Sequence, residues 1–152
     1  MLRFIDAEAK HTELLRDTVI SSKGYWGYFQ EQLEQWRSNL RFEDEYVSRN
    51  TVKLILHESE VIGFFAIVKG DIDALDHLWL LPKAIGKGFG NLVFEKILSE
   101  CKKLDIAEFY IVSDPDAEGF YLKKGALKVE EVYSEPQKRM LSKLKYLVAM
   151  ST

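Results

Sequence analysis

A loop with three alternating glycines is the segment of this sequence whose residues best suit chemistry. It reads IGKGFGN, from Ile85 to Asn91, and follows a strand-like run that ends at Pro82. An amphipathic helix pattern begins at Phe89, and the first N–H groups of a helix lack partners and favour negative charge. Glycine lets the backbone approach a phosphate, and Lys87 adds a cation. The loop predicts a cradle for a pyrophosphate-sized anion or, alternatively, a turn that only caps the helix.

The loop fits neither of the two common nucleotide-binding motifs. The dinucleotide fingerprint G-x-G-x-x-G would need a glycine where Asn91 stands. The Walker pattern G-x-x-x-x-G-K-[ST] would need a glycine at Leu81 and a hydroxyl residue at Gly88. An unrelated α/β protein that binds NAD or ATP is therefore only a remote third hypothesis.

Composition and charge exclude several classes of protein. The chain has 152 residues, of which 47% are hydrophobic, so we expect a single domain over residues 1–152 with a sizeable core. The net charge of −3 gives no bulk attraction to nucleic acid or to an anionic membrane. The longest apolar-rich stretch, Val61 to Val68, is too short to span a bilayer, and the first ten residues do not resemble a signal peptide. We therefore expect a cytoplasmic protein.

Cysteine and histidine give no sign of a metal site. Cys101 is the single cysteine, so no internal disulfide can form, which fits a reducing compartment. It shares the apolar stripe of the predicted helix with Val93 and Ile97, and we interpret it as a core residue. His11 and His57 stand alone, without the spacing that metal ligands need. No metal is expected.

Hydrophobic periodicity predicts an alternation of strands and helices along the chain. Strands are expected at Leu2–Asp6, Thr51–His57, Val61–Lys69, Asp73–Leu81, Ile106–Val112, Leu127–Tyr133 and Lys143–Met150, and helices at Ala9–Ser22, Tyr28–Asn39, Phe89–Leu104 and Ala117–Lys124. The order is therefore β-α-α-β-β-β-α-β-α-β-β. Short turns make the three consecutive strands antiparallel, and the following strand-helix-strand unit adds a parallel neighbour. This predicts an α/β fold with a mixed, mostly antiparallel central sheet and helices on both faces.

A second segment, DPDAEGFYLKKGA from Asp114 to Ala126, together with the glycine loop resembles the signatures of the GNAT superfamily of acyl-CoA-dependent N-acyltransferases. The family's loop reads [QR]-x-x-G-x-[GA] after a strand that ends in V-x-P, which is matched here by LLP ending at Pro82 and by the loop itself. The family's second signature is N-x-x-A-x-x-F-Y-x-K-x-G-[FA]. Its positions are occupied by Asp114, Ala117, Phe120, Tyr121, Lys123, Gly125 and Ala126. The predicted order of elements is also the family's, so the resemblance covers nearly the whole chain.

Two residues depart from these signatures. Ile85 stands where the family has Gln or Arg, so one polar contact to the pyrophosphate is missing while the backbone amides remain. Asp114 stands for the usual Asn and, when ionised, can accept but not donate a hydrogen bond. The departures leave open a non-catalytic sensor that binds CoA or an acyl-CoA, as the alternative to an enzyme.

The resemblance implies that acetyl-CoA is the co-substrate and that no metal takes part. In the family the fourth and fifth strands splay apart to admit the pantetheine arm, and a main-chain N–H near Leu80 polarises the thioester. The residues implied in binding the co-substrate are Trp79, Leu80, Leu81, Ile85, Gly86, Lys87, Gly88, Phe89, Gly90, Asn91, Asp114, Ala117, Phe120 and Tyr121.

The resemblance also implies a general acid and a general base. Tyr121 corresponds to the family's acid, which protonates the departing CoA thiolate; alternatively it only packs beside Phe120. Strand alternation places Asp76 on the same face as Leu80, so Asp76 is the first candidate for the base. His77 titrates nearer neutral pH but faces the other way, and solvent is the third candidate.

The acceptor is implied to be a primary amine, of a small molecule or of a peptide or protein. The family usually forms its acceptor pocket at the positions of Tyr25, Trp26 and Tyr28, and aromatic rings can bind a cation. Alternatively, these three side chains only pack between two helices. The WGY letters here also resemble a bacterial branch of the family. The family often forms dimers through its last strands, so a homodimer is one expectation.

Overall fold

The computed structural model describes residues 1–25, 30–40, 42–135 and 137–148, and for Tyr25 and residues 36–39 it describes the backbone alone. The described chain divides into two compact units. The first comprises Met1–Ile67 with His77–Ile97, and the second comprises Val68–Asp76 with Leu98–Thr152. The expectation of a single domain over residues 1–152 stays a prediction.

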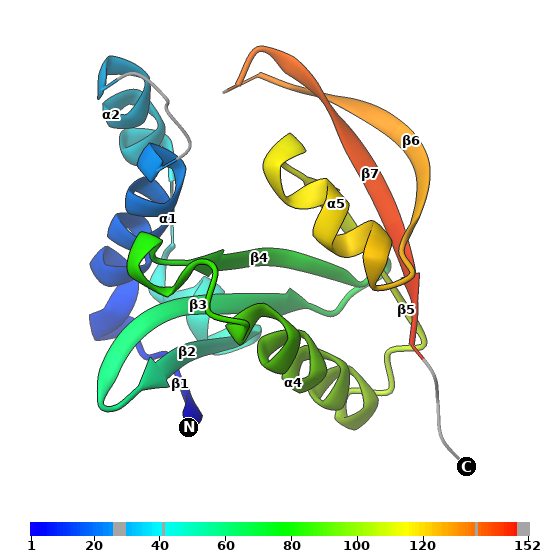
Figure 1. The fold of residues 1–152 in the computed structure, drawn as a ribbon, viewed down its shortest axis with the longest axis horizontal. Helices are drawn as coiled ribbons and strands as arrows, with labels where there is room; N and C mark the ends of the chain where they lie inside the picture. The colour runs from blue at the N-terminus through cyan, green and yellow to red at the C-terminus, as the bar shows by residue number, and fades with distance from the viewer. Residues whose placement is uncertain (26–29, 41, 136, 149–152) are drawn as a thin grey trace. The chain divides into compact units, whose positions relative to one another are not determined.

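The strands and helices expected from the sequence are present in the described ranges, with shifted ends (Figure 1). In chain order the elements are β1 (Leu2–Asp6), a 3-10 turn (Ala9–His11), α1 (Thr12–Tyr25), α2 (Gln30–Asn39), α3 (Asp44–Arg49), β2 (Thr51–His57), β3 (Glu60–Val68), β4 (Ala74–Leu80), a second 3-10 turn (Pro82–Ala84), α4 (Phe89–Lys103), β5 (Glu108–Ser113), α5 (Pro115–Lys123), β6 (Leu127–Ser134) and β7 (Arg139–Leu147).

The strands form a seven-stranded mixed sheet in the order β1-β2-β3-β4-β5-β7-β6. The pairs β1–β2, β2–β3, β5–β7 and β6–β7 are antiparallel. β4 and β5 pair in parallel, with Ala74 opposite Tyr110, as expected for strands joined through a helix. The predicted mixed, mostly antiparallel sheet is thereby confirmed.

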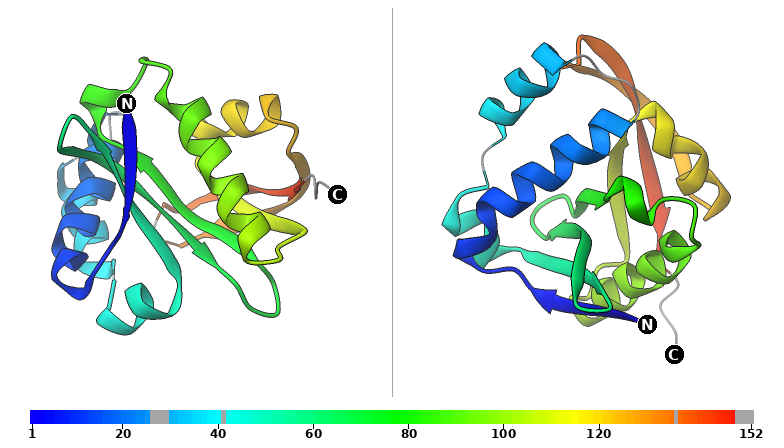
Figure 2. Two further views of the ribbon diagram at one scale, coloured as in Figure 1. Left: turned by 90° about the horizontal axis from the view of Figure 1, so that it is seen from below. Right: turned by 60° about the vertical axis from the view of Figure 1, so that its left-hand side comes forward.

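In the first unit, helices cover both faces of the strands (Figure 2). One face packs against α1 and α3 in a cluster that contains Ala7, Leu15, Val19, Phe42, Val47, Val52, Leu54, Leu56, Phe64 and Ala66. The other face carries Phe4 and Phe65, whose ring centroids lie 6.2 Å apart. Lys96 of α4 lies 5.7 Å over the Phe4 ring, so α4 covers this second face. Successive side chains of β1, β2 and β3 point to opposite faces of the sheet, so each strand contributes to both apolar layers.

The predicted turn between β2 and β3 is a two-residue hairpin loop. Glu58 and Ser59 have φ angles of 50° and 73°, and His57 pairs with Glu60 across the turn. Positive φ at both central residues gives the backbone twist that a tight hairpin needs. Glu60 therefore begins the strand, where the sequence predicted a third turn residue.

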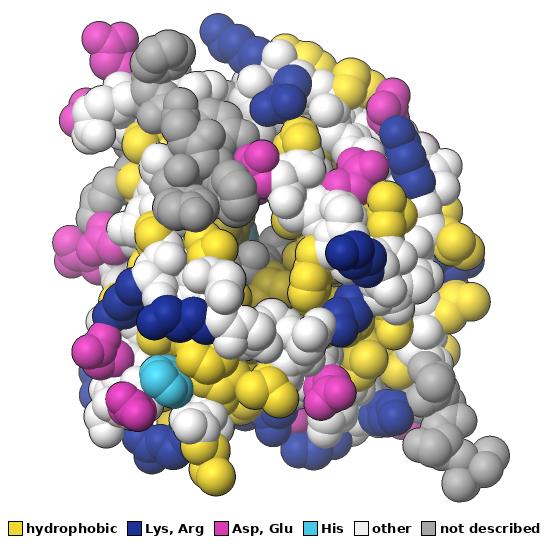
Figure 3. All heavy atoms as spheres, viewed as in Figure 1, with side chains coloured by type: hydrophobic (Ala, Val, Ile, Leu, Met, Phe, Trp, Pro, Cys, Tyr) yellow, Lys and Arg dark blue, Asp and Glu magenta, His cyan; other side chains and the backbone are white. Residues whose placement is uncertain are grey.

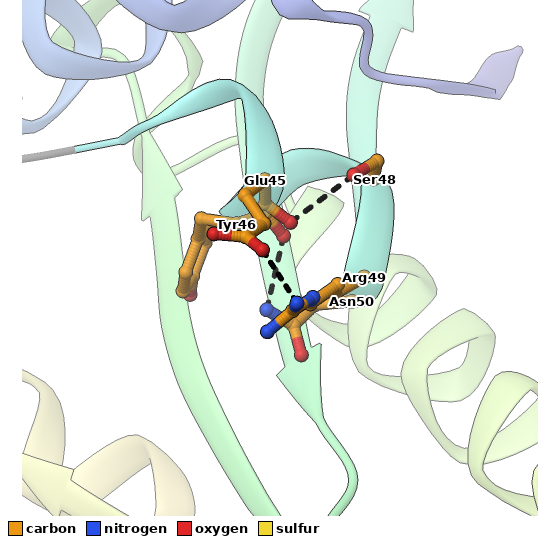
Figure 4. A network of polar contacts seen from close by, with 5 residues as sticks. All are labelled: Glu45, Tyr46, Ser48, Arg49 and Asn50. Atoms are coloured by element: carbon orange, nitrogen blue, oxygen red, sulfur yellow. Dashed lines mark hydrogen bonds and ion pairs between the residues drawn. The ribbon is translucent and has the colours of Figure 1, made fainter.

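Helix α3 was not predicted from the sequence, because it is too short to show an apolar period. Its polar ends do show a signal: Asp44 and Glu45 lie in the first turn and Arg49 in the last, as the helix dipole favours. Figure 4 shows Arg49 in an ion pair with Glu45 one turn earlier, and the Asn50 side chain donating to the Tyr46 carbonyl at the helix end. These local bonds explain why so short a helix forms.

In the second unit, α5 lies alongside β5 and β7 (Figure 1). The buried layer between them includes Phe109, Ile111 and Leu144, and Phe109 stacks on Tyr146 with ring centroids 5.4 Å apart. Gly125 follows the C-cap residue Lys124 and has a φ of 106°, a conformation in which glycine commonly ends a helix.

The last strand was predicted wrongly at both ends. The expected strand ran from Lys143 to Met150, whereas β7 runs from Arg139 to Leu147. Its first residues pair with β6, Ser134 opposite Arg139 and Tyr133 opposite Met140, although the segment between the strands is polar. β6 is the last strand of the sheet and is mostly exposed, so backbone pairing rather than apolar burial defines this hairpin.

Candidate active site

In the first unit, the end of β4 is held against β3 by backbone contacts. The Leu81 N–H donates to the Ile62 carbonyl at 2.7 Å. The Trp79 carbonyl oxygen lies so close to Gly63 that a Cβ there would be 2.1 Å from it. Gly63 is therefore required for the close approach of the two strands.

These contacts fix the direction of the Leu80 main chain. A trans peptide points its C=O and the next N–H in opposite directions. Because the Trp79 carbonyl and the Leu81 N–H both face β3, the N–H and C=O of Leu80 both face away from it. The Leu80 carbonyl accepts a 2.7 Å hydrogen bond from the buried hydroxyl of Ser22 in α1. The Leu80 N–H is thus directed to the β4 edge opposite β3.

Two glycines of the loop after β4 have a left-handed backbone. Gly86 and Gly88 have φ angles of 81° and 78°, which favour glycine, and a Cβ at either would meet open space. Lys87 between them is exposed. The loop leads into α4 at Phe89, whose first-turn N–H groups lack helical partners. Unpaired main-chain N–H groups at the start of a helix suit an anion.

An ion pair holds the segment just before this loop. Lys83 in the second 3-10 turn pairs with Glu60 at the start of β3, and this hydrogen bond lowers the pKa of the Glu60 carboxyl. His57 at the end of β2 contacts the Phe89 ring, with centroids 4.9 Å apart. The start of α4 is therefore packed against the β2–β3 hairpin.

His77 and Trp79, two residues apart, lie on the same face of β4. The Trp79 indole Nε1 donates to His77 Nδ1 at 2.9 Å. The imidazole packs against Phe42 and Phe64, with centroids 4.9 and 5.8 Å away. Nδ1 thus acts as an acceptor inside an aromatic cluster, which suits a structural role better than that of a base. Asp76, the neighbouring candidate, has an exposed side chain.

Lys23, which the sequence analysis did not single out, belongs to the same cluster. Its ammonium group lies 5.0 Å from the centroid of the Trp79 ring, and the side chain is only 8% exposed. The ring face of Trp79 stabilises this buried cation. The predicted pocket residues Trp26 and Tyr28, and the side chain of Tyr25, lie outside the described part of the chain.

In the second unit, the general-acid candidate Tyr121 is almost fully buried on α5, with 5% of its surface exposed. Burial first, and the negative charge of Asp114 second, raise its pKa well above the ordinary value of a phenol. Phe120 packs edge-on against it at 5.5 Å. The phenol is therefore held in its protonated form, which an acid requires.

Asp114 stands at the N-cap of α5 but makes no side-chain capping bond. Its Oδ1 accepts instead a 2.7 Å hydrogen bond from the side-chain amide of Gln137, which lies between β6 and β7. Its main-chain carbonyl accepts from the buried Ser113 hydroxyl at 2.8 Å and from the Ala117 N–H at 3.0 Å. Asp114 is thus the centre of a polar cluster, and Gln137 is a member that sequence reasoning missed.

Cys101 is unsuited to covalent catalysis. It is 1% exposed, and burial raises the pKa of its thiol to about 12, so the reactive thiolate is disfavoured at neutral pH. Within the described ranges, no three His, Cys, Asp or Glu side chains gather as a metal site requires. None of the helices in those ranges combines the length and apolarity of a membrane span. On the face shown in Figure 3, basic and acidic side chains are interspersed.

Comparisons with known proteins agree with these observations. Residues 22–140 match the family model described as the acetyltransferase (GNAT) domain. The structure is similar to that of the PaiA N-acetyltransferase from Thermoplasma acidophilum in complex with coenzyme A, with a TM-score of 0.78 and 17% identity over 97% of this chain and 99% of that one. No curated protein matches the sequence significantly.

Two further solved structures have the same fold. One is an acetyltransferase of the GNAT family from Staphylococcus aureus, with a TM-score of 0.70 and 16% identity over 97% of this chain and 99% of that one. The other is a GNAT family acetyltransferase from Elizabethkingia anophelis with acetyl-CoA bound, with a TM-score of 0.66 and 13% identity over 96% and 97%. At these identities the structural likeness shows the fold, whereas the family model shows the family.

Proposed function

The chain belongs to the GNAT family of acetyltransferases, and from this premise we propose that it moves an acetyl group from acetyl-CoA directly to a primary amine. The observation that carries the proposal is the main chain of the first unit. Gly86 and Gly88 are exposed and have positive φ angles, and the Leu80 N–H faces away from β3. The loop amides from Ile85 to Asn91 suit the pyrophosphate of CoA, and the Leu80 N–H suits the thioester carbonyl.

In the proposed reaction the amine nitrogen attacks the carbonyl carbon, the C–S bond breaks, and the amine loses a proton. The Leu80 N–H stabilises the negative charge that develops on the carbonyl oxygen. Tyr121 protonates the departing thiolate, a role that its buried, protonated phenol supports. Asp76 or solvent accepts the proton of the amine; the hydrogen bond from Trp79 to His77 makes His77 the weaker candidate.

The remaining residues implied by the family keep their proposed roles. Trp79 and Leu81 contribute main chain beside the pantetheine arm, and Ala117 and Phe120 of α5 contribute to binding the co-substrate. Tyr25, Trp26 and Tyr28 are proposed to line the acceptor pocket. The single cysteine, held as a thiol, supports a reducing compartment such as the cytoplasm.

Isothermal titration calorimetry with CoA, acetyl-CoA, NAD and ATP tests the binding half of this proposal. We expect binding of CoA and acetyl-CoA and none of NAD or ATP. Failure of both CoA forms to bind would overturn the proposal.

The second candidate function is a sensor that binds CoA without turnover. Ile85 and Asp114, which replace polar residues of the family signatures, favour it. Binding of acetyl-CoA without release of CoA in the presence of any amine would support the sensor against the enzyme.

A further inference from the structure

The hydroxyl of Ser22 in α1 bonds to a distant strand instead of to its own helix. A Ser or Thr hydroxyl inside a helix commonly bonds to the carbonyl four residues earlier. Thr18 does so, since its Oγ1 donates to the Leu14 carbonyl at 2.8 Å. Ser22, one turn later, is buried and donates to the Leu80 carbonyl at 2.7 Å. The bond from α1 to β4 is therefore made in preference to a local one.

This bond holds one peptide group at the end of β4 from a second side. The peptide that joins Leu80 to Leu81 accepts from Ser22 through its C=O. Through its N–H the same peptide donates to the Ile62 carbonyl of β3 at 2.7 Å. A planar peptide that is bonded at both ends cannot turn without losing a bond. The direction of the Leu80 main chain is thus held from α1 as well as from β3.

The bond also changes what the edge of β4 opposite β3 offers to a ligand. Leu80 directs both its N–H and its C=O to this edge, and within the described ranges β4 pairs with a strand there through Ala74 alone. An open edge of this kind offers a donor and an acceptor to an extended ligand. Because Ser22 already donates to the carbonyl, Leu80 offers its N–H beside an acceptor that is in use.

A thioester and an amide differ in how well they suit such an edge. The pantetheine arm of CoA contains amides, each with a C=O and an N–H, whereas the thioester has a C=O and no N–H. An amide placed at Leu80 would have to share the carbonyl with Ser22, and a donor left without a partner is costly. The thioester needs a donor alone, so it loses nothing at this position.

We propose that Ser22 sets the position of acetyl-CoA along β4. By using the Leu80 carbonyl, it favours the position in which the Leu80 N–H receives the thioester carbonyl. Positions in which Leu80 pairs with an amide of the pantetheine arm become less favourable. The inference rests on the proposed function and adds a residue to it. Ser22 acts through Leu80 and is therefore a positioning residue.

Three variants separate this role from simple packing. Ser22→Ala removes the hydroxyl, and Ser22→Thr keeps it. Ser21→Ala is the matched control, because it makes the same change one residue earlier in α1, where the side chain is exposed. Urea denaturation of each variant shows whether it is folded under the conditions of the assay.

Two ligands isolate the contribution of the thioester carbonyl. S-Ethyl-CoA has nearly the size of acetyl-CoA, but a CH₂ group replaces the carbonyl. The ratio of the two dissociation constants, measured by isothermal titration calorimetry, therefore reports the hydrogen bond to that carbonyl. The ¹³C signal of acetyl-CoA labelled at the carbonyl carbon is the second readout, because a hydrogen bond to the oxygen shifts it.

We expect the wild type to bind acetyl-CoA about fivefold more tightly than S-ethyl-CoA, as one hydrogen bond would give. In Ser22→Ala this ratio should fall to about twofold or less, while the affinity for S-ethyl-CoA stays within about twofold of the wild type. The carbonyl signal of bound acetyl-CoA should then move toward that of the free ligand. Ser22→Thr and Ser21→Ala should keep the wild-type ratio.

A ratio that Ser22→Ala leaves unchanged would overturn the inference. An equal loss of affinity for both ligands in Ser22→Ala would also overturn it, because that result marks a residue needed only for the structure. A wild type that binds both ligands equally would overturn the inference while the binding of the co-substrate stands. A wild type that binds neither ligand would defeat the proposed function itself, and the inference with it.

Discussion

The glycine loop of the first unit and the start of α5 in the second unit correspond to the two signatures of one family, but they work through different groups. The loop depends on main chain: Gly86 and Gly88 have positive φ, and open space surrounds them. The start of α5 depends on side chains: Asp114 is bonded to Gln137, and burial, followed by the charge of Asp114, raises the pKa of Tyr121.

This difference explains how each region tolerates departures from the family pattern. Ile85 replaces a polar residue in a region whose main-chain amides are proposed to bind the co-substrate, so we expect a small effect on affinity. Asp114 replaces Asn in a region where the side chain matters, and Gln137 has an amide that adapts to it. We therefore expect a departure from the family signature to have little effect on binding where the main chain forms the site. Where side chains form the site, the same kind of departure should change its chemistry.

Gly63→Ala should have the largest effect of any single substitution considered, because it disturbs the close approach of two strands in the first unit. The added Cβ would lie 2.1 Å from the Trp79 carbonyl oxygen, so β3 or β4 must move. We expect a loss of about 3 kcal/mol in unfolding free energy, measured by urea denaturation.

Gly70→Ala is the matched control, since a Cβ there meets nothing within 4 Å. Its unfolding free energy should stay within about 0.5 kcal/mol of the wild type. Equal losses in the two variants would contradict the close approach of β3 and β4.

Tyr121→Phe removes the hydroxyl that is proposed as the general acid. It should lower kcat about 100-fold, with the KM for acetyl-CoA nearly unchanged. Steady-state kinetics of CoA release measures both. Because the pKa of the phenol is raised, the wild type should keep its acid protonated at pH 10. An unchanged kcat in Tyr121→Phe would contradict the role of Tyr121 as the acid and would mean that the ring only packs in the core.

The sequence predicted the backbone region better than the side-chain region. Hydrophobic periodicity, together with proline and glycine at the ends of elements, locates β4, the loop and α4. The positions of these elements depend on residues that are close together in the chain, so a single sequence is enough to predict them.

The missed features depend on distant partners. Ser22 bonds to Leu80 across 58 positions, and Gln137 bonds to Asp114 across 23. Nothing local marks either residue, because a serine in a helix and a glutamine in a turn are ordinary. Such pairs follow only from the folded chain.

Gly88→Ala tests the backbone region with a milder change. An L-residue at a φ of 78° is strained by about 1 kcal/mol or more, so the loop should distort. We expect acetyl-CoA affinity to fall about fivefold to tenfold by calorimetry. Lys87→Ala should cost less, because this exposed side chain is one contact among several amides. The reverse order would mean that side chains dominate in the loop as well.

The smallest expected effect is a fall in the free energy of unfolding at alkaline pH, caused by the Cys101 thiol. Below pH 9 its thiol is protonated in both the folded and the unfolded states, so it adds no pH dependence. Above pH 9 the unfolded state loses the proton while the folded state, with a pKa of about 12, keeps it, so stability falls as pH rises. Urea denaturation at pH 8 and 9.5 should show a loss about 0.8 kcal/mol larger in the wild type than in Cys101→Ala. Parallel losses would contradict the raised pKa.

Direct transfer of the acetyl group to an amine is tested by following the release of CoA from acetyl-CoA with a thiol reagent, in the presence and absence of a panel of primary amines. Spermidine, 1,4-diaminobutane, free amino acids and a peptide with a free N-terminus represent the acceptor classes. We expect amine-dependent release of CoA, with an acetylated amine detected by mass spectrometry in equal amount and no acetylated enzyme. Tight binding of acetyl-CoA with no amine-dependent release would contradict direct transfer to an amine and leave a sensor.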